Sequence, residues 1–380
     1  MNKSNLLTLL PILGGLFGGQ TAAQPVVADV ERIVSDIHSI ISSEISNTLA
    51  SIDFKTLQKE APRIMDGTTA DPSDPTAFAF QKEKVIEKQF SVTPRHSLSI
   101  DNRYGKVSVQ NWNRDEVKVT IRIRTAENAE RRAQEALDRV HIAESRSDNV
   151  ISLKTQISSS DANWWSSLTS GSGDRALRID YAVYMPKGND LTLTNKYGPV
   201  ELADRDGRVS LSVSYGSLHT GRLNGRNNSL TVAYSKGVID YLREGEVTVR
   251  YGGIRLSESD RLKLSSSYSD GEIGRINQAA DVEVRYGSSF RMGLGSDIKE
   301  VNVNAAYAPV TIEPSASADF NFSVAISYGG FDYDNGSVHI TSKAEGTTSK
   351  SYTGYWNRSG SNTGNINSRY GAVNLSKPLP

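Results

Sequence analysis

The sequence has no cysteine among its 380 residues. It therefore cannot form disulfides, thiolate zinc sites or iron–sulfur clusters, and it offers no cysteine for catalysis or lipid attachment. An excess of charge is also missing, because 43 lysines and arginines balance 43 aspartates and glutamates. Nucleic acids are bound largely through clustered positive charge, so we expect no nucleic-acid partner. Apolar residues make up only 37% of the chain, which suits many short strands that each bury one face.

Long hydrophobic runs are lacking, and the short one at the N-terminus does not reach the roughly 20 residues of a membrane-spanning helix. Residues 6–19 are apolar but contain Pro11, and small residues at 21–23 follow them. This order is typical of a secretory signal. We expect residues 1–23 to be a cleaved signal peptide and the protein to be exported to the periplasm or cell surface. The alternative is an uncleaved membrane anchor.

The sequence motifs typical of enzymes are also missing. The five histidines form no H-x-x-x-H pattern, and no nucleophile elbow, P-loop or dinucleotide fingerprint occurs. The segment 332–336 is similar to the start of a calcium loop, but Lys343 stands where a bidentate glutamate is required, so we expect a turn. We expect no enzyme, cofactor or metal site. Acidic residues occupy different places in the repeats described below: Asp240, Glu258, Asp270, Glu272, Asp281 and Glu283.

Two segments precede the main β pattern. Residues 24–64 repeat apolar side chains every three or four positions, which predicts an amphipathic helix. Its apolar stripe requires a partner, either the rest of the chain or a second copy through residues 25–62. Residues 65–89 begin with prolines, aspartates and a glycine, and we expect a linker there.

Residues 90–190 predict an α+β capping region. Apolar residues alternate with polar ones from residue 98 onward, and residues 126–140 carry good helix formers with one apolar side. Strands are expected again at 150–157 and 177–185. The loop between them contains Trp164 and Trp165.

A repeated tyrosine, followed by glycine or another small residue, is the strongest pattern in the chain. From Tyr197 to Tyr328 the gaps are 17 to 21 residues. Periods near 20 residues with β patterning indicate stacked coils that share one core. We expect a β-solenoid over residues 191–340 and a polar tail over 341–380 whose final coil closes the stack. The structural tyrosines are Tyr104, Tyr197, Tyr215, Tyr234, Tyr251, Tyr268, Tyr286, Tyr307, Tyr328 and Tyr370.

Strand periodicity predicts which way these tyrosines point. The aliphatic residues before each tyrosine lie an even number of positions away, as Val209, Leu211 and Val213 do before Tyr215. Residues two apart share a face of a strand, so we expect the tyrosines to face the core with the aliphatics. Beyond the tyrosine the pattern shifts, which indicates a corner where glycine permits positive φ. The alternative is a row of rings that stack on sugars. Residues Trp164, Trp165, Tyr355 and Trp356 are further candidates for contacts.

Several of these units resemble a known family. The segments NRYGKVSVQNW (102–112), NKYGPVEL (195–202), SVSYGSL (212–218) and VRYGGIRL (249–256) are similar to the putative adhesin family of bacterial β-solenoid proteins, the DUF4097 type. Residues 179–218 and 352–376 especially resemble members from Bacteroidetes. The resemblance spans about residues 90–376. It implies a mainly β fold, a single-stranded β-solenoid or β-helix of about eight to ten short coils, and it supplies no catalytic residues.

The expected function is therefore an exported, non-catalytic scaffold or adhesin-like binding protein of the bacterial cell envelope. Its partner would be a cell-surface glycan or an envelope protein. One alternative is a carbohydrate-active enzyme, a polysaccharide lyase or hydrolase built on a β-helix. Another is an envelope-sensing component whose leading helix docks on a membrane partner.

Overall fold

The computed structural model describes residues 79–158 and 175–377, which lie in the second of two compact units, residues 60–380. The expected signal peptide, the expected helix at 24–64 and the pair Trp164–Trp165 lie outside the described residues. No helix within the described ranges is long and apolar enough to cross a membrane.

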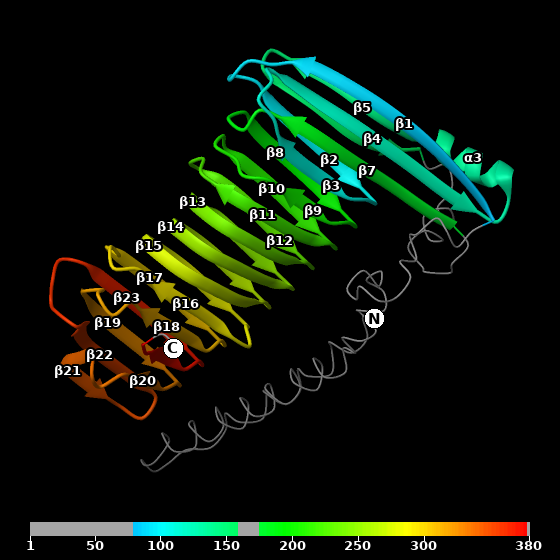
Figure 1. Ribbon diagram of the computed structural model, residues 1–380. Coiled ribbons are helices and arrows are strands. Elements are labelled where there is room, and N and C mark those ends of the chain that lie inside the picture. The colour runs from blue at the N-terminus through cyan, green and yellow to red at the C-terminus, as the bar shows by residue number, and fades with distance from the viewer. Residues whose placement is uncertain (1–78, 159–174, 378–380) are drawn as a thin grey trace, which may run out of the picture. The chain divides into compact units, whose positions relative to one another are not determined.

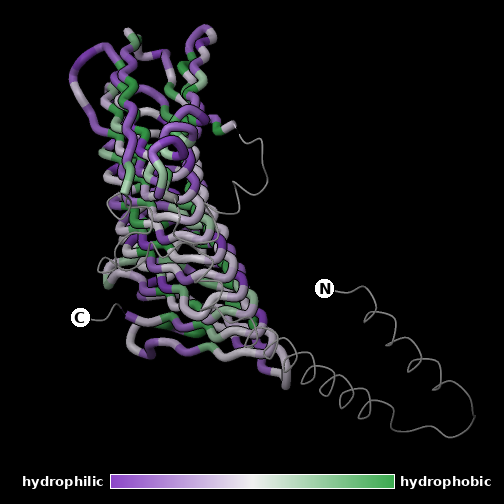
Figure 2. The backbone as a smooth tube through the Cα atoms, turned by 90° about the vertical axis from the view of Figure 1, so that its right-hand side faces the viewer, coloured by the Kyte–Doolittle hydropathy of each residue, from purple (hydrophilic) through white to green (hydrophobic). Residues whose placement is uncertain are grey.

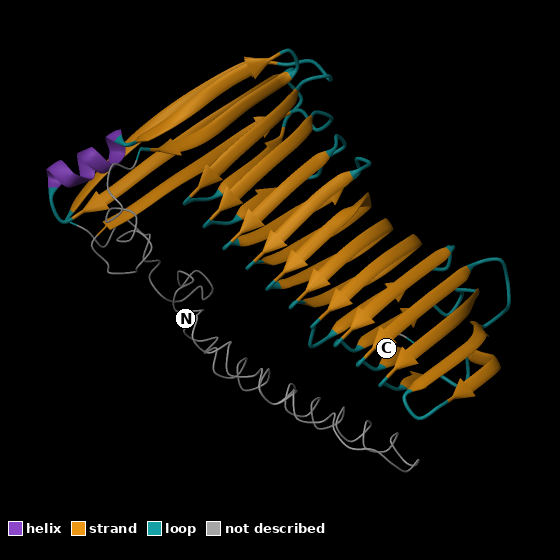
Figure 3. Cartoon of the chain, turned by 180° about the vertical axis from the view of Figure 1, so that it is seen from behind, coloured by secondary structure: helices purple, strands orange, loops and turns teal. Residues whose placement is uncertain are grey.

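All described strands belong to one mainly parallel hydrogen-bonded sheet (Figures 1 and 3). It comprises two ladders of strands, called ladder A and ladder B here. Ladder A runs through β5 (Val140–Ser147), β6 (Val150–Ile157), β2 (Ser97–Arg103), β8 (Asp190–Lys196), β10 (Val209–Ser214), β12 (Asn228–Ala233), the second halves of β13 (Lys236–Arg250), β14 (Gly253–Ser267) and β15 (Asp270–Arg285), β17 (Glu300–Ala306), β23 (Thr363–Arg369), β19 (Phe320–Ser327), β22 (Ser349–Trp356) and β21 (Val338–Glu345).

Ladder B is formed by the strands that follow the tyrosine corners and by three further strands at its N-terminal end. Its order is β1 (Phe80–Ser91), β4 (Glu116–Glu127), β7 (Arg175–Met185), β3 (Val107–Asn111), β9 (Val200–Leu202), β11 (Ser217–Leu223), the first halves of β13, β14 and β15, β16 (Phe290–Leu294), β18 (Val310–Pro314), β24 (Val373–Leu375) and β20 (Phe331–Tyr333).

The strand of ladder A before a repeat tyrosine and the strand of ladder B after it are together called a rung here. Equivalent positions of neighbouring rungs pair directly. Leu211 pairs with Leu193 on one side and with Leu230 on the other. All three side chains are at most 3% exposed, so the alternate apolar residues of each strand form continuous columns. The inner columns of both ladders belong to one hydrophobic core. In Figure 2, apolar positions recur in each successive turn of the chain.

Antiparallel strands complete the sheet at its N-terminal end. The expected linker 65–89 is wrong over its last ten residues, because Phe80–Ser91 forms β1 and pairs with β4 along its whole length. Charges such as Lys82 and Glu83 lie along this edge strand, and charged edges discourage pairing with other chains. The helix α3 (Glu130–Asp138) is shorter than the expected 126–140, because β4 continues to Glu127.

The last rung does not close the stack, contrary to expectation. Strand β23 pairs with β17 on one side and β19 on the other, so the rung of Tyr370 lies between those of Tyr307 and Tyr328. The C-terminal end is completed instead by the antiparallel hairpin β22–β21 and by β20, which has three residues. A short strand and a bulged, charged hairpin are common ways to protect a sheet edge.

Candidate functional site

The ten repeat tyrosines form one continuous stack at the corners between ladder A and ladder B, called the tyrosine stripe here. Successive ring centroids are 4.8–5.1 Å apart, and the planes differ by at most 15°. The order along the stripe is Tyr104, Tyr197, Tyr215, Tyr234, Tyr251, Tyr268, Tyr286, Tyr307, Tyr370 and Tyr328.

The tyrosines do not face the core, so that prediction is wrong. Six of them are 44–56% exposed, with Tyr328 the most exposed, and the other four are partly buried. Each of the ten has φ between 50° and 62°, in the left-handed region. Counting positions by two assumes that every residue is extended, and one left-handed residue redirects its own side chain. The rings therefore leave the core column and line the outer corner.

The glycine after the tyrosine was expected to supply positive φ at the corner, but its role is different. Positive φ belongs to the tyrosine, whereas the glycine allows neighbouring rungs to approach. A Cβ atom at Gly216 would lie 2.1 Å from the carbonyl oxygen of Gly198, and one at Gly198 equally close to that of Gly105. Three rungs carry a Cβ at this position, and both neighbours of each are glycines. They are Ser235, Ser269 and Ala308.

The left-handed conformation is held in place by contacts of the same tyrosines. For a residue other than glycine it costs about 1–2 kcal/mol. Nine of the ten tyrosine N–H groups donate to a carbonyl of the adjoining rung, as Tyr215 does to Ala233 at 3.2 Å, and that of Tyr328 donates to Thr348 of the β21–β22 hairpin. Each ring pair adds about 0.5–1.5 kcal/mol beyond area burial. The stack thus offsets the backbone cost, and the stripe is part of the fold as well as a surface.

Stacking decides which part of each ring a ligand can reach. Because the rings lie nearly parallel, their faces contact one another, and in the six exposed tyrosines the edges and hydroxyl groups are left for solvent. At about 4.8 Å per rung the stripe is roughly 43 Å long. It presents a regular row of phenol groups that can both donate and accept hydrogen bonds.

Basic residues border the stripe on the outer face of ladder A. The residue before each tyrosine points outward, and none of these ten residues is acidic. Asparagine side chains pair across neighbouring rungs farther along this face, with Asn367 donating to Asn304 at 3.2 Å. The outward basic residues are Arg103, Lys196, Arg250, Arg285 and Arg369.

A groove lies on this face near the C-terminal end. It has a volume of about 690 Å³ and is enclosed by the tip of the β21–β22 hairpin and by strands β17, β19 and β23. Its lining includes Asn304, Asn367, Arg369 and Lys350, together with small residues. These groups can donate hydrogen bonds to a polar ligand.

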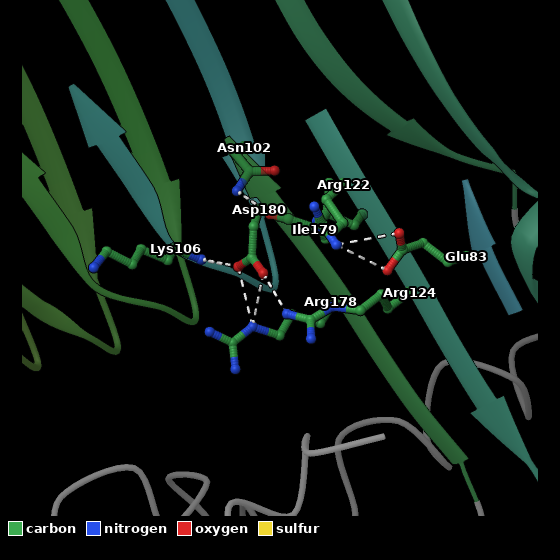
Figure 4. Close-up of polar contacts among 8 residues, drawn as sticks. All are labelled: Glu83, Asn102, Lys106, Arg122, Arg124, Arg178, Ile179 and Asp180. Carbon is green, nitrogen blue, oxygen red and sulfur yellow. Dashed lines mark hydrogen bonds and ion pairs between the residues drawn. The ribbon is translucent and has the colours of Figure 1, made fainter. Parts of the chain in front are cut away.

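A second depression, called the basic hollow here, lies on ladder B beside the first tyrosine. It has a volume of about 410 Å³, and Asp180 of β7 lies at its centre (Figure 4). The Asp180 carboxylate accepts hydrogen bonds from the backbone N–H of Lys106 at 2.8 Å, from Arg124 at 2.7 Å and from Arg178 at 3.0 Å. Arg122 of the same lining pairs with Glu83 at 3.2 Å.

The acidic residues considered for catalysis do not form one site. Glu272 pairs with Arg255, and Glu283 pairs with Arg285. One acidic pair was not predicted from the sequence: Glu258 and Asp260 both accept from Asn277, at 2.9 and 3.0 Å. The hydrogen bond from Asn277 and the charge of Arg275 lower the pKa of Glu258, whereas a general acid needs a raised pKa. Among the described residues, no cluster of three or more acidic or histidine side chains could hold a metal.

Two smaller expectations have different outcomes. Trp356, proposed as an exposed contact residue, is fully buried and donates from Nε1 to the carbonyl of Ser315 at 3.3 Å. The segment 332–336 includes a turn, as expected, in which the N–H of Gly336 donates to Asp334. The Asp334 carboxylate is paired with Lys377 at 3.2 Å.

The raised pKa values of two tyrosines predict how the stability of the fold changes at high pH. Burial and the neighbouring Tyr197 raise the pKa of Tyr104 to about 12, and burial raises that of Tyr181 to about 12. The folded state therefore favours the neutral phenols. Their contribution to stability is complete below pH 10 and is lost as the pH rises through 12. In a spectrophotometric titration we expect the part of the phenolate absorbance that comes from Tyr104 and Tyr181 to appear at higher pH than that of free tyrosine, together with the loss of the circular dichroism signal of the β-sheet. Complete ionisation near pH 10 with the sheet intact would contradict this prediction.

Comparisons with known proteins give only distant similarities. No family model matches the chain, and no curated protein matches it. Among solved structures, a putative adhesin from Parabacteroides distasonis ATCC 8503 is 10% identical, with a TM-score of 0.34, over 77% of this chain and 97% of that one. A putative adhesin from Bacteroides fragilis NCTC 9343 is 10% identical, with a TM-score of 0.31, over 78% and 97%. A putative lipid binding protein from Parabacteroides distasonis ATCC 8503 is 7% identical, with a TM-score of 0.27, over 78% and 98%. These similarities are too weak to assign a function.

Proposed function

We propose that the chain is an exported, non-catalytic, adhesin-like binding protein of the bacterial cell envelope, and that its tyrosine stripe binds an extended glycan. In this proposal the two ladders are the two sides of a β-solenoid, and the coils present the stripe as a rigid surface. The observation that carries the proposal is the exposure of the stripe. Six successive or nearly successive rings show about half of their surface to solvent, although stacking covers their faces.

The chemistry of the stripe favours a sugar polymer over other extended ligands. Sugar hydroxyls both donate and accept hydrogen bonds, as the phenol groups of the stripe do. Nucleic-acid bases are usually held by stacking on aromatic faces, and these faces are already occupied by neighbouring tyrosines. A peptide strand binds by adding to a free sheet edge, whereas the stripe lies at the corners and away from both edges.

Replacement of hydroxyl groups without loss of the rings tests the stripe directly. We expect the triple variant Tyr234→Phe, Tyr251→Phe, Tyr268→Phe to keep its stability, because phenylalanine rings can stack in the same way. Binding to a panel of immobilised polysaccharides should weaken at least tenfold, since each lost hydrogen bond is worth about 1 kcal/mol. Biolayer interferometry with the full mature chain measures this change.

Tyr184 supplies the matched control for this experiment. It is 44% exposed but lies on β7 outside the stripe, with its ring 5.7 Å from that of Trp112. Tyr184→Phe should leave polysaccharide binding unchanged. The proposal is wrong if no polysaccharide of the panel binds, or if the triple variant binds as tightly as the unmodified protein.

Export is tested separately from binding. If the leading residues are a signal peptide, protein recovered from the periplasm or the cell surface should begin at Gln24, which intact-mass spectrometry detects. Recovery of the full-length chain from the cytoplasm alone would contradict export.

A further inference from the structure

We propose that the middle of the tyrosine stripe binds an acidic glycan, whose carboxylate or sulfate groups pair with Arg250 on one side of the stripe and with Lys236 on the other. This inference rests on the proposed function and specifies the charge of the ligand. It is carried by exposed cations along the two borders of the stripe that have no carboxylate partner within residues 79–158 and 175–377.

The border of the stripe on ladder A is formed by the residue before each tyrosine. Five of these ten residues are basic and none is acidic. Arg285 pairs with Glu283. The other four basic residues form no ion pair with a carboxylate in the described part of the chain. They are Arg103, Lys196, Arg250 and Arg369. Unpaired positive charge therefore occurs along this border from the first rung of the stripe to the rung of Tyr370.

The border on ladder B is formed by the residue two positions after each tyrosine, and three of these ten residues are charged. Lys106 pairs with Glu201 at 2.6 Å, whereas Lys236 has no ion pair with a described carboxylate. Asp270 accepts hydrogen bonds from the N–H and the hydroxyl of Ser288, at 3.2 and 2.6 Å. The two borders together thus carry five unpaired cations and one carboxylate that is not paired with a cation.

Arg250 and Lys236 lie beside the same pair of rings. Lys236 belongs to the rung of Tyr234, and Arg250 belongs to the next rung, that of Tyr251. The N–H of Tyr234 donates to the carbonyl of Arg250 at 2.9 Å, which joins the two rungs at the corner. Both rings are 46% exposed. A chain that lies along the edges of these rings therefore has one cation on each side.

The surroundings of the two cations leave room for a ligand. The side chains of Arg250 and Lys236 are exposed. A guanidinium presents a planar fork of N–H donors that fits a carboxylate or a sulfate, and an ammonium adds a point charge. The residues that pair with Arg250 and Lys236 in the neighbouring rungs are all small: Ala233, Ser267, Ser217 and Gly253.

A pair of ligands that differ in charge separates this proposal from the function of the stripe. The probes are polygalacturonate and its fully methyl-esterified form, which keeps the sugar backbone and loses the charge, with chondroitin sulfate as the sulfated probe. We expect the double variant Arg250→Gln, Lys236→Gln to bind the acidic chains about tenfold more weakly or worse, because charge-assisted hydrogen bonds are lost. The ester should bind without change. Increasing salt should reduce the difference, because exposed charges are screened.

Arg255 provides a matched arginine away from the stripe. It belongs to the same rung as Arg250 but lies on the outer face of ladder B, where it pairs with Glu272 at 2.7 Å and has a side chain that is 65% exposed. Arg255→Gln should bind both probes as the unmodified protein does. The double variant should unfold in urea at the same concentration as the unmodified protein, because neither Arg250 nor Lys236 has an ion pair to lose among the described residues.

Asp270 tests the proposal in the opposite direction. It lies on the ladder B border beside Tyr268, and its charge repels an acidic chain. Asp270→Asn keeps an oxygen for the N–H of Ser288 and removes the negative charge. This variant should bind the acidic chains severalfold more tightly and the ester without change.

Four outcomes would overturn the inference. The first is equal binding of acidic and esterified chains by the unmodified protein. The second is unchanged binding of the acidic chains by the double variant. The third is equal loss for both probes in that variant, which would indicate a general effect on the stripe. The fourth is tighter binding of single-stranded DNA or of phosphatidylglycerol vesicles than of any acidic glycan. Failure of the stripe itself differs from these, because the triple phenylalanine variant would then bind the ester as the unmodified protein does.

Discussion

Gly252→Ala is expected to lower the free energy of unfolding by about 3 kcal/mol or more, whereas Gly253→Ala should be nearly neutral. A Cβ atom at Gly252 would lie 2.0 Å from the carbonyl oxygen of Ser235. That oxygen is backbone in the adjoining rung, so a rotamer change cannot relieve the clash. Overpacking costs about 1–3 kcal/mol and occasionally more, and here the two rungs would have to separate.

Gly253 is a matched control for Gly252. Around Gly253 only the carbonyl oxygen of Asp270 lies within 4 Å of an added Cβ, at 3.7 Å. The two residues are adjacent, and neither has φ in the left-handed region. They therefore differ mainly in how close an added Cβ atom would come to neighbouring atoms. Gly253→Ala should change stability by less than about 1 kcal/mol, through the entropy of the unfolded chain. Urea unfolding followed by circular dichroism measures both. Equal stabilities for the two variants would refute the close-approach role of this glycine.

The rung pattern was predictable from the sequence because it depends on two local signals. Aliphatic residues alternate with polar ones before every tyrosine, and the tyrosines recur at nearly constant spacing. Alternation selects a strand with one buried face, and constant spacing places equivalent residues side by side. Leu193, Leu211 and Leu230 pair in the register that the spacing predicts.

The direction of the tyrosines could not be obtained from the same alternation. A count by two holds only while every residue is extended, and Tyr215 has φ of 56°. The shift of the pattern after each tyrosine was visible in the sequence, but it was attributed to the glycine. Close contacts such as that between Gly216 and the carbonyl of Gly198 depend on the distance between rungs, which no single repeat encodes.

The pairing of the last repeat and the local clustering of arginines could not be predicted from the sequence either. The spacing of 42 positions from Tyr328 to Tyr370 gave no sign that β23 returns to pair with β17 and β19. A neutral net charge likewise concealed the basic hollow, whose arginines come from β4 and β7, more than 50 residues apart in sequence. Both features arise from tertiary contacts that unite distant segments.

Arg205 was another residue that the sequence did not single out, and its replacement by alanine should cost about 3–5 kcal/mol. It follows the short strand β9, where an arginine between two aspartates is typical of an exposed turn. Instead its side chain is fully buried. Its Nη1 donates to Asn111 at 2.8 Å, and its Nη2 donates to the carbonyls of Pro186 and Asn189 at 2.8 and 2.7 Å.

The expected loss follows from the acceptors that Arg205 leaves behind. Burial lowers its pKa to about 10, so the group remains charged at neutral pH and its hydrogen bonds are charge-assisted. An unsatisfied buried acceptor costs about 1–3 kcal/mol. Asn189 also donates to the carbonyls of Thr93 and His96, each at 2.7 Å. Removal of Arg205 should therefore loosen the connection between β1 and β2 as well.

Arg208 is the control for the Arg205 experiment because it lies three residues away and its side chain is 61% exposed. Its ion pair with Asp190 spans 3.6 Å, and a surface pair of this kind contributes about 1 kcal/mol at most. Arg208→Ala should unfold in urea almost as the unmodified protein does. Arg205→Ala should unfold at a clearly lower concentration and show faster hydrogen exchange around residues 93–96. If both variants unfold alike, the buried guanidinium does not hold these segments together, and water satisfies the acceptors in its place.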